Sequence, residues 1–321
     1  MNNKRKYKHF FSTNCDTVLN NFPKPLKDQE VIDPFCGNGD LVNWLGRSVI
    51  EYDIEPRRPT STQRDSLRNP PSYSNKFVLT KPPFMARNKS SDKTIFDIFG
   101  QNDLFKIFIM QICSDPPNGG ILLLPVNFWS STRSKDIELR TAFLKLFLVN
   151  RVNIYEKALF EDGALSAVWF SLSQTVVNIP FYFFPNGGQR VFIFDPSTNY
   201  TIGWDIIKLS KQIFPFTVTR VIKGKSPPNT NLKLKTLDNI ILSWSDEPYY
   251  GKETSRAFAS LCIEPPIDTN RQKLLIEQFN AFVSLNRAKY KSMWLSNYRE
   301  GARKRMGFKL AYSIIKYLLN Y

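Results

Sequence analysis

An α/β fold with a doubly wound, mostly parallel sheet is the class that the sequence predicts, followed by a smaller module and a helical C-terminal segment. Short apolar runs recur along the first half of the chain and end near glycine or proline, as buried strands do. Segments with helical spacing separate several of these runs, and parallel strands require such crossovers. The expected strands are 31–32, 48–50, 76–80, 121–125, 152–155 and 167–172.

The expected helices follow from the spacing of the apolar residues. Residues 7–26 indicate a turn and then a short amphipathic helix through Val18, Leu19 and Phe22, which ends at Pro23. Further helical spacing predicts helices at 41–46, 92–113 and 137–148.

The sequence changes character after Gln174, where aromatic and β-branched segments alternate with Pro, Asn and Gly turns. A basic stretch broken by prolines follows at 220–235, and residues 272–321 have mostly helical character with an interruption near Ser296. These shifts predict three segments, namely 1–178, 179–265 and 266–321.

The composition is that of a soluble globular protein large enough to bury a full core, with 321 residues, 42% hydrophobic and 22% charged. Its longest apolar runs are far too short to span a bilayer, so no membrane partner is expected. The basic N-terminus has no apolar stretch behind it and does not resemble a secretory signal. A cytoplasmic location is expected, or a nuclear or viral location if the chain comes from a eukaryotic virus.

Metal ligation and histidine chemistry are disfavoured by the residues that would carry them. The four cysteines have no CxxC spacing, and His9 is the only histidine, so neither a zinc site nor a disulfide framework is predicted. No Pro-Cys pair is present, which argues against methylation of cytosine C5 through a cysteine nucleophile.

The chain carries a formal net charge of +16, from 44 basic and 28 acidic residues. Eleven Lys or Arg residues stand against two Glu between Arg271 and Tyr321, so much of the excess lies in the last segment. Such an excess favours a polyanionic partner, because each neutralised phosphate releases counterions. The alternative is a solvated basic surface without a partner.

The segment Asp33-Pro34-Phe35-Cys36-Gly37-Asn38-Gly39 follows the first predicted strand. Its glycines allow a tight turn whose backbone amides approach a ligand closely, although a lone GxG is also common in ordinary strand-to-helix turns. Asp53 follows about 20 positions later, after the second predicted strand, where an acid can bind ribose hydroxyls. A nicotinamide site is disfavoured, since Trp44 and Leu45 stand where a third glycine should open the helix.

Lys81-Pro82-Pro83-Phe84 follows the third predicted strand. Together with the glycine segment, this tetrapeptide resembles the S-adenosylmethionine-dependent DNA methyltransferases that modify exocyclic amino groups. Their strand-end signatures are DPFxGxG and then Asp, Asn or Ser followed by Pro-Pro and an aromatic residue. The order of the motifs is similar to adenine-N6 enzymes of restriction–modification or viral type, whose cofactor region precedes the catalytic region. The resemblance implies a Rossmann-like methyltransferase sheet.

The resemblance implies S-adenosyl-L-methionine as the cofactor and assigns each predicted segment a role. Residues 1–178 become the cofactor-binding catalytic domain, 179–265 the target-recognition module and 266–321 a basic helical segment. In this assignment Asp53 binds the ribose, Asp65 the adenine and Thr13 the methionine end, with Asn14 in place of the family's proline. The implied cofactor-binding residues are Thr13, Asp33, Pro34, Phe35, Gly37, Gly39, Asp53 and Asp65.

In the family, the first residue of the tetrapeptide accepts a hydrogen bond from the amino group of a flipped adenine, and the aromatic ring stacks on the base. Lys81 departs from this pattern, because a charged lysine is only a donor. The chain is then a homologue without turnover, an engineered inactive variant, or an enzyme in which a neighbouring group supplies the acceptor. Two similar sequences, Asn69-Pro70-Pro71 and Asp115-Pro116-Pro117, are predicted to be turns.

The partner implied by the resemblance is double-stranded DNA, with a cognate restriction endonuclease or a partner subunit. Alternatives are a methyltransferase-like protein that binds cofactor or DNA without catalysis, and an RNA adenine methyltransferase. Trp294 to Glu300 is similar to the closing segment of one branch of type II modification enzymes. The candidate DNA-binding residues are Arg220, Lys223, Lys225, Arg299, Arg303, Lys304 and Arg305.

Overall fold

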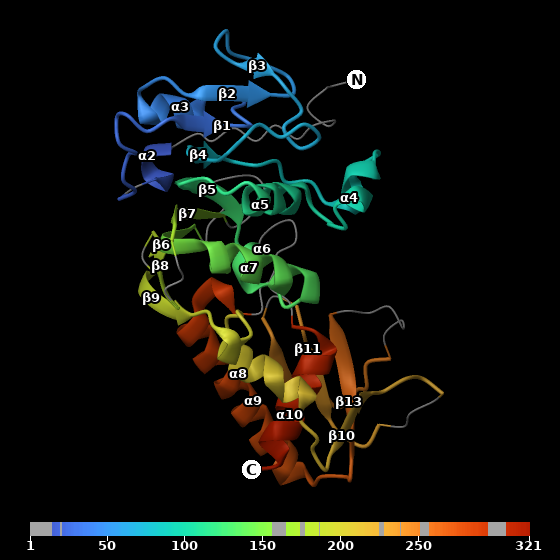
Figure 1. Cartoon of the computed structure of the whole chain (residues 1–321). Coiled ribbons are helices and arrows are strands. Elements are labelled where there is room, and N and C mark those ends of the chain that lie inside the picture. Colours follow the sequence, from blue (N-terminus) through green and yellow to red (C-terminus); the bar gives the residue numbers. More distant parts are fainter. Residues whose placement is uncertain are drawn as a thin grey trace. The chain divides into compact units, whose positions relative to one another are not determined.

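A computed structural model describes residues 15–19, 21–155, 165–173, 177–185, 187–224, 228–237, 239–250, 257–294 and 306–321. The chain forms two compact units, Met1–Tyr200 and Thr201–Tyr321 (Figure 1). Within the described ranges, no helix combines the length and the apolar character needed to cross a membrane.

The first unit is built on a nine-stranded sheet with the order β3-β2-β1-β4-β5-β7-β6-β8-β9. The strands from β3 to β5 are parallel to one another, whereas β7 is antiparallel to both of its neighbours. Strand β8 is parallel to β6, and β9 is antiparallel to β8. The strands are β1 (Val31–Asp33), β2 (Ile50–Asp53), β3 (Thr62–Gln63), β4 (Phe77–Thr80), β5 (Gly119–Pro125), β6 (Phe147–Tyr155), β7 (Leu165–Leu172), β8 (Asn178–Phe184) and β9 (Gly188–Ile193).

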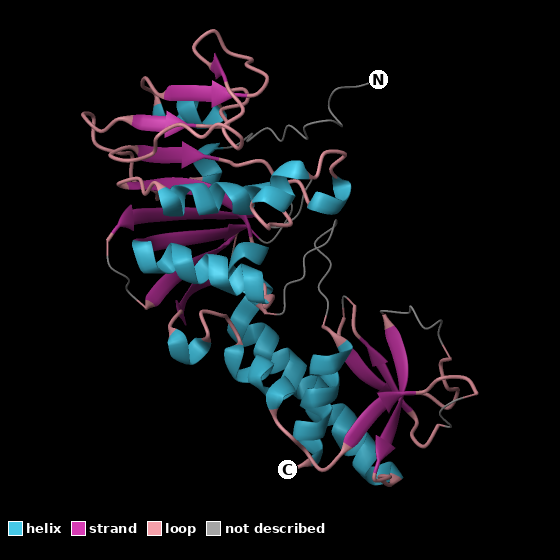
Figure 2. Ribbon diagram, turned by 45° about the vertical axis from the view of Figure 1, so that its right-hand side comes forward, coloured by secondary structure: helices cyan, strands magenta, loops and turns pink. Residues whose placement is uncertain are grey.

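Helices cover both faces of this sheet, which confirms the predicted doubly wound α/β class (Figures 1 and 2). The short helices α2 and α3 pack on one face, and the longer α5 and α7 lie across the other. The helical elements are α2 (Cys15–Val18), α3 (Asp40–Leu45), η1 (Arg87–Lys89), α4 (Thr94–Ile98), α5 (Leu104–Ser114), α6 (Asn127–Ser130), α7 (Ser134–Leu146) and η2 (Pro196–Thr198).

The helix expected over 92–113 is two helices, α4 and α5. Gly100 adopts a positive φ of 62° between them, a conformation that ends a right-handed helix and that glycine adopts without strain. Asp103 then precedes the first residue of α5 in extended conformation.

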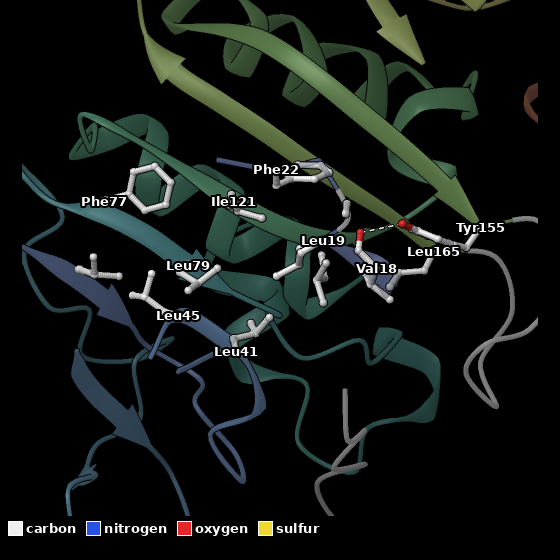
Figure 3. Packing of buried hydrophobic residues seen from close by; sticks show 13 residues of the cluster. Val18, Leu19, Phe22, Leu41, Leu45, Phe77, Leu79, Ile121, Tyr155 and Leu165 are labelled. Atoms are coloured by element: carbon white, nitrogen blue, oxygen red, sulfur yellow. Dashed lines mark hydrogen bonds between the residues drawn. The ribbon is translucent and has the colours of Figure 1, made fainter. Parts of the chain in front are cut away.

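The core on the α2 and α3 face joins residues from distant parts of the chain. Figure 3 shows Val18 and Leu19 of the α2 segment and Leu41 of α3 gathered near Leu79 of β4 and Ile121 of β5. The hydroxyl group of Tyr155 on β6 donates to the backbone oxygen of Val18 at 2.7 Å, which ties the α2 segment to the sheet. The alternation of apolar residues along β5 leaves its other side chains to the α5 and α7 face.

Strands β4, β5 and β7 approach one another closely at Gly120. A Cβ atom built there would lie 2.3 Å from the backbone oxygen of Val78 and 2.9 Å from the ring of Phe170. Only glycine fits this position of the sheet without a shift of its neighbours.

Two buried charged residues, Asp136 and Arg140, hold α7 against its neighbours in the first unit. Lys106 of α5 forms a buried ion pair with Asp136 of α7. Arg140 of α7 is 0% exposed, and its guanidinium donates to the backbone oxygens of Phe128 at 2.7 Å and of Tyr200. Burial lowers the pKa of Arg140 to about 9, while the negative charge of Asp136 acts in the opposite direction.

The second unit contains a four-stranded antiparallel sheet with the order β10-β13-β11-β12. The side-chain amide of Asn280 on α9 bonds both the N–H of Leu242 (3.0 Å) and its oxygen (2.9 Å), so α9 is fixed against β12. The elements are α8 (Trp204–Ile207), η3 (Lys208–Lys211), β10 (Thr217–Arg220), β11 (Leu232–Lys235), β12 (Ile241–Trp244), β13 (Phe258–Glu264), α9 (Thr269–Tyr290), η4 (Lys291–Met293) and α10 (Phe308–Leu319).

The structural division differs from the boundaries expected at 178 and 265. Strand β8 pairs with β6 of the large sheet, with Val152 opposite Phe181, so residues up to Tyr200 belong to the first unit. The change of composition after Gln174 marks the addition of two strands to the same sheet. The C-terminal helices share one unit with the small sheet, as the contact of α9 with β12 requires. A target-recognition role for 179–265 stays a prediction.

Candidate functional site

The order of the large sheet defines a point at which ligands bind in doubly wound folds. From β1 the chain continues to β2 and β3 on one side, and then returns to β4 on the other side of β1. Ligands bind at the carboxyl ends of the strands where the winding direction reverses. Asp33 ends β1, Asp53 ends β2 and Lys81 directly follows β4, so three of the sequence-predicted residues stand at this edge.

The glycine loop after β1 is held by β2. Gly37 has a φ of 55° and Gly39 a φ of 80°, conformations that L side chains rarely adopt. The N–H of Gly37 donates to Asp53 Oδ2 at 2.9 Å, and the N–H of Cys36 donates to the oxygen of Tyr52 at 2.9 Å. The loop therefore has one fixed course across the ends of β1 and β2.

Asp53 is oriented by backbone amides on both sides. Its Oδ1 accepts from the N–H of Glu55 at 2.9 Å, while Oδ2 accepts from Gly37. The side chain is only 6% exposed but lines the pocket described below. A fixed carboxylate of this kind can accept hydrogen bonds from a diol without reorganisation.

Asp33 accepts a hydrogen bond from the backbone of the glycine loop and does not line the pocket. It is 1% exposed, and its Oδ1 accepts from Thr80 Oγ1 at 2.6 Å and from the N–H of Phe35 at 3.1 Å. Burial raises the pKa of Asp33 to about 7, although these two hydrogen bonds act in the opposite direction. The bond to Thr80 joins the ends of β1 and β4.

Asp65 and Ser66 form the turn that closes the other side of the pocket. Asp65 Oδ1 accepts from the N–H groups of Leu67 and Arg68, each at 3.2 Å, and Arg68 Nε lies 3.3 Å from Asp65 Oδ2. Ser66 is 2% exposed, and its hydroxyl oxygen has no hydrogen-bond partner among the described residues. Ser66 lines the pocket, and its hydroxyl can donate a hydrogen bond to a polar group bound there.

The tetrapeptide lies on the β4 side of the pocket. Lys81 is half-buried, and its Nζ stands 5.8 Å from the centroid of the Phe84 ring. Phe84 packs edge-on against Phe105 of α5, with 6.0 Å between ring centroids. Burial raises the pKa of the Cys15 thiol to about 12, and Lys81 opposes this rise, so the thiol and the ammonium group lie in the same electrostatic environment.

These elements enclose a pocket of about 480 Å³. Phe35, Gly37, Asp53, Asp65, Lys81, Pro82 and Pro83 line it, whereas Asp33, Pro34, Gly39 and Phe84 stand outside its lining. The sequence analysis missed Ser66, because a single serine in a turn carries no recognisable pattern. Further lining residues are Ile54, Arg64, Ser66, Leu67, Arg68, Met85, Ser90, Ser91, Asp92, Ile95, Phe96 and Leu104.

Thr13, Lys225, Arg299, Arg303, Lys304 and Arg305 lie outside the described residues. Arg220 and Lys223 belong to the second unit. The two similar Pro-Pro sequences lie in loops as expected, and the carboxylate of Asp115 holds the preceding loop by accepting from the N–H of Tyr73 at 2.7 Å. No group of His, Cys, Asp and Glu residues suited to a metal ion occurs within the described ranges.

No protein-family model and no curated protein sequence matches the chain. Among solved structures, it is similar to a chain of a type I restriction–modification system, with 18% identity over 53% of this chain and 42% of the other and a TM-score of 0.42. A protein from Vibrio vulnificus, described as a modification subunit of a type I restriction enzyme, has 16% identity over 64% and 53% and a TM-score of 0.44.

The methyltransferase subunit of a type I restriction–modification system from Streptococcus thermophilus has 14% identity over 56% of this chain and 48% of the other, with a TM-score of 0.38. The chain thus spans about half the length of the solved chains that it matches. At these identities and TM-scores, a functional assignment rests on the chain's own residues.

Proposed function

We propose that the first unit binds S-adenosylmethionine and acts as a DNA adenine-N6 methyltransferase in which Lys81 strongly limits methyl transfer. The observation that carries this proposal is the convergence of Gly37, Asp53, Asp65 and the first three residues of the tetrapeptide on one pocket at the reversal point of the sheet. The four come from separate stretches of the sequence. An ordinary strand-to-helix turn would not require them to meet.

The pocket residues fit the cofactor in volume and in chemistry. About 480 Å³ lies within the range of small-molecule sites. Asp53 would bind the ribose hydroxyls, the loop at Gly37 would hold the methionine part, and Asp65 would lie by the adenine. The buried hydroxyl of Ser66 would gain a partner there. When bound, the cofactor supplies an electrophilic methyl group.

The residues of the tetrapeptide would position the acceptor. An adenine must leave the duplex to reach such a pocket, and its amino group must be held by hydrogen-bond acceptors so that its lone pair faces the methyl group. The backbone oxygen of Pro82 remains as one acceptor. A charged Lys81 offers only donors at the second position, so the amino nitrogen is poorly oriented.

The test combines binding and transfer. Calorimetry with S-adenosylmethionine is expected to give binding for the wild-type chain, whereas transfer of a labelled methyl group to duplex DNA is expected to be very weak. Lys81→Asn and Lys81→Asp should raise transfer about a hundredfold or more, because they restore a positioning acceptor. Lys145→Asn, at an exposed lysine of α7, removes the same charge as a control.

Each outcome separates the alternatives. Absence of cofactor binding contradicts the proposed site. Strong transfer by the wild type, without a gain from Lys81→Asn, would show that another group supplies the acceptor. Binding without transfer in all variants favours the second candidate function, a protein that binds cofactor or DNA without catalysis, which the lysine in the catalytic position supports. Transfer to RNA in preference to duplex DNA would assign the substrate to RNA.

A further inference from the structure

The small sheet of the second unit has two faces of opposite character. The register places Leu234 opposite both Leu242 and Ala259, and these buried residues lie on the face that α9 covers. The next residues along β11 point the other way, because side chains alternate along a strand. Lys233 is opposite Ser243 and Ser260, and Lys235 is opposite Phe258.

Two lysines and two aromatic rings meet on this second face. Lys233 Nζ lies 5.5 Å from the ring centroid of Tyr249 and 5.9 Å from that of Phe258. Lys235 Nζ lies 5.9 Å from the centroid of the Phe258 ring. The rings of Tyr249 and Phe258 are 5.9 Å apart. We call these four residues the lysine–aromatic cluster.

The cluster is built into the sheet and is more than a chance meeting of long side chains. The N–H of Tyr249 donates to Ser260 Oγ at 2.7 Å, which fixes the residue over β13. Phe258 begins β13, and its partner Lys235 ends β11. Neither ring belongs to the buried core, since both side chains remain partly exposed.

The positive charge of the cluster is not neutralised by the described residues of the unit. Among them, no carboxylate forms an ion pair with Lys233 or Lys235. Asp246 accepts from the indole N–H of Trp244 at 2.8 Å, and Glu264 Oε1 accepts from the amide of Asn229 at 3.1 Å. As far as the described residues go, both ammonium groups can therefore donate to an external anion.

We propose that the lysine–aromatic cluster is a nucleic-acid contact, in which the lysines bind backbone phosphates and the rings of Tyr249 and Phe258 stack on bases. Interleaved basic and aromatic side chains on a sheet surface suit this partner, because phosphates need cations and every base offers a flat face. The net charge of +16 complements a polyanion. This contact does not depend on methyl transfer by the first unit.

The proposal changes the expected role of one basic residue. Arg220 of β10 is opposite Leu261, whose side chain is buried, so it belongs to the helix-covered face. Its charge lowers the pKa of Tyr312 on α10, although burial raises that pKa overall. We therefore assign the phosphate contacts of this sheet to Lys233 and Lys235, and not to Arg220.

The test measures DNA affinity of the full chain by fluorescence anisotropy, with a labelled duplex and a labelled single strand over a series of salt concentrations. The double variant Lys233→Gln/Lys235→Gln is expected to weaken binding. It should also reduce the slope of log affinity against log salt by about 1 to 2, because each lost phosphate contact accounts for roughly 0.7 to 0.9. The matched control is Lys309→Gln/Lys316→Gln on α10, which removes the same charge and should leave the slope nearly unchanged.

A third variant, Phe258→Leu, keeps an apolar side chain and all charges. It is expected to lower single-strand affinity by roughly tenfold, the loss typical of one stacked base, with a smaller effect on the duplex. Thermal unfolding of each variant checks that the second unit remains folded. Equal salt slopes for the two double variants would overturn the proposal, as would equal weakening of binding to anionic lipid vesicles and DNA. An unchanged single-strand affinity in Phe258→Leu would overturn the stacking role of the ring.

Discussion

The buried carboxyl group of Asp33 should make the first unit less stable as the pH rises from about 4 to about 7. In the unfolded chain the group has its ordinary pKa near 3.8, and in the folded unit burial raises the pKa to about 7. Between these values the folded state holds a proton that the unfolded state has released. The contribution of Asp33 to the free energy of unfolding is therefore fully present below the pKa of the unfolded state. It is lost as the pH rises toward and through the pKa of the folded state.

The magnitude follows from the difference between the two pKa values. Each pH unit of difference corresponds to about 1.36 kcal/mol, so the loss approaches about 4 kcal/mol above neutral pH. Asp33→Asn cannot ionise, yet its side-chain oxygen can still accept from Thr80 and from the N–H of Phe35. The variant should therefore equal the wild type near pH 4 and exceed its free energy of unfolding by about 2 to 4 kcal/mol near pH 8.

Urea unfolding between about pH 4 and pH 8 measures this effect, with the m-value as a check that the unfolded state is unchanged. Asp28→Asn, at an exposed carboxylate before β1, is the matched control and should follow the wild type. If Asp33→Asn and the wild type showed the same pH dependence, Asp33 would be ionised in the folded unit across the whole range. The reasoning from burial would then be wrong.

Two further predictions concern the site and the sheet. Asp53→Ala should weaken S-adenosylmethionine binding by about 1 to 3 kcal/mol, because it removes a charge-assisted acceptor and the partner of the Gly37 N–H; unchanged affinity in calorimetry would exclude Asp53 from the site. Gly120→Ala should destabilise the first unit by about 1 to 3 kcal/mol in thermal unfolding, because the added Cβ meets the Val78 oxygen at 2.3 Å. Gly307→Ala, where no atom lies within 4 Å of the new Cβ, should cost only a few tenths of a kcal/mol, and equal losses in both variants would contradict the packing argument.

The residues at the carboxyl ends of β1, β2 and β4 could be predicted, because the local sequence marks where each strand ends. A glycine segment after an apolar run, and an acid after the next run, each mark a strand end without knowledge of the fold. The meeting of these ends in one pocket follows from the parallel order of the strands. The structure confirms the α/β class and places Asp53, Asp65 and Lys81 around the same pocket. Their roles toward a cofactor stay predictions.

Other features depend on contacts between distant residues and leave little trace in the sequence. Strands β8 and β9 differ in composition from the earlier strands, because they lie at the end of the sheet, and so they suggest a separate module. The hydroxyl of Ser66, which has no hydrogen-bond partner among the described residues, can be recognised only when its burial is known. Similarly, a basic stretch does not indicate which of its cations face solvent. The register of β10 with β13 places Arg220 on the covered face.

The hydrogen bond from Arg140 to the backbone oxygen of Tyr200 sets a lower limit on any fragment that is to carry the pocket. A fragment ending at residue 178 would lose this acceptor, so the Nε–H of the buried Arg140 would lose its hydrogen bond while the bond to Phe128 remained. It would also expose the edge of β6 along Val152 to Tyr155, where β8 now pairs. A lost hydrogen bond at a buried guanidinium and an open strand edge both favour unfolding and aggregation. The smallest independently expressed form of the site should therefore end after Tyr200.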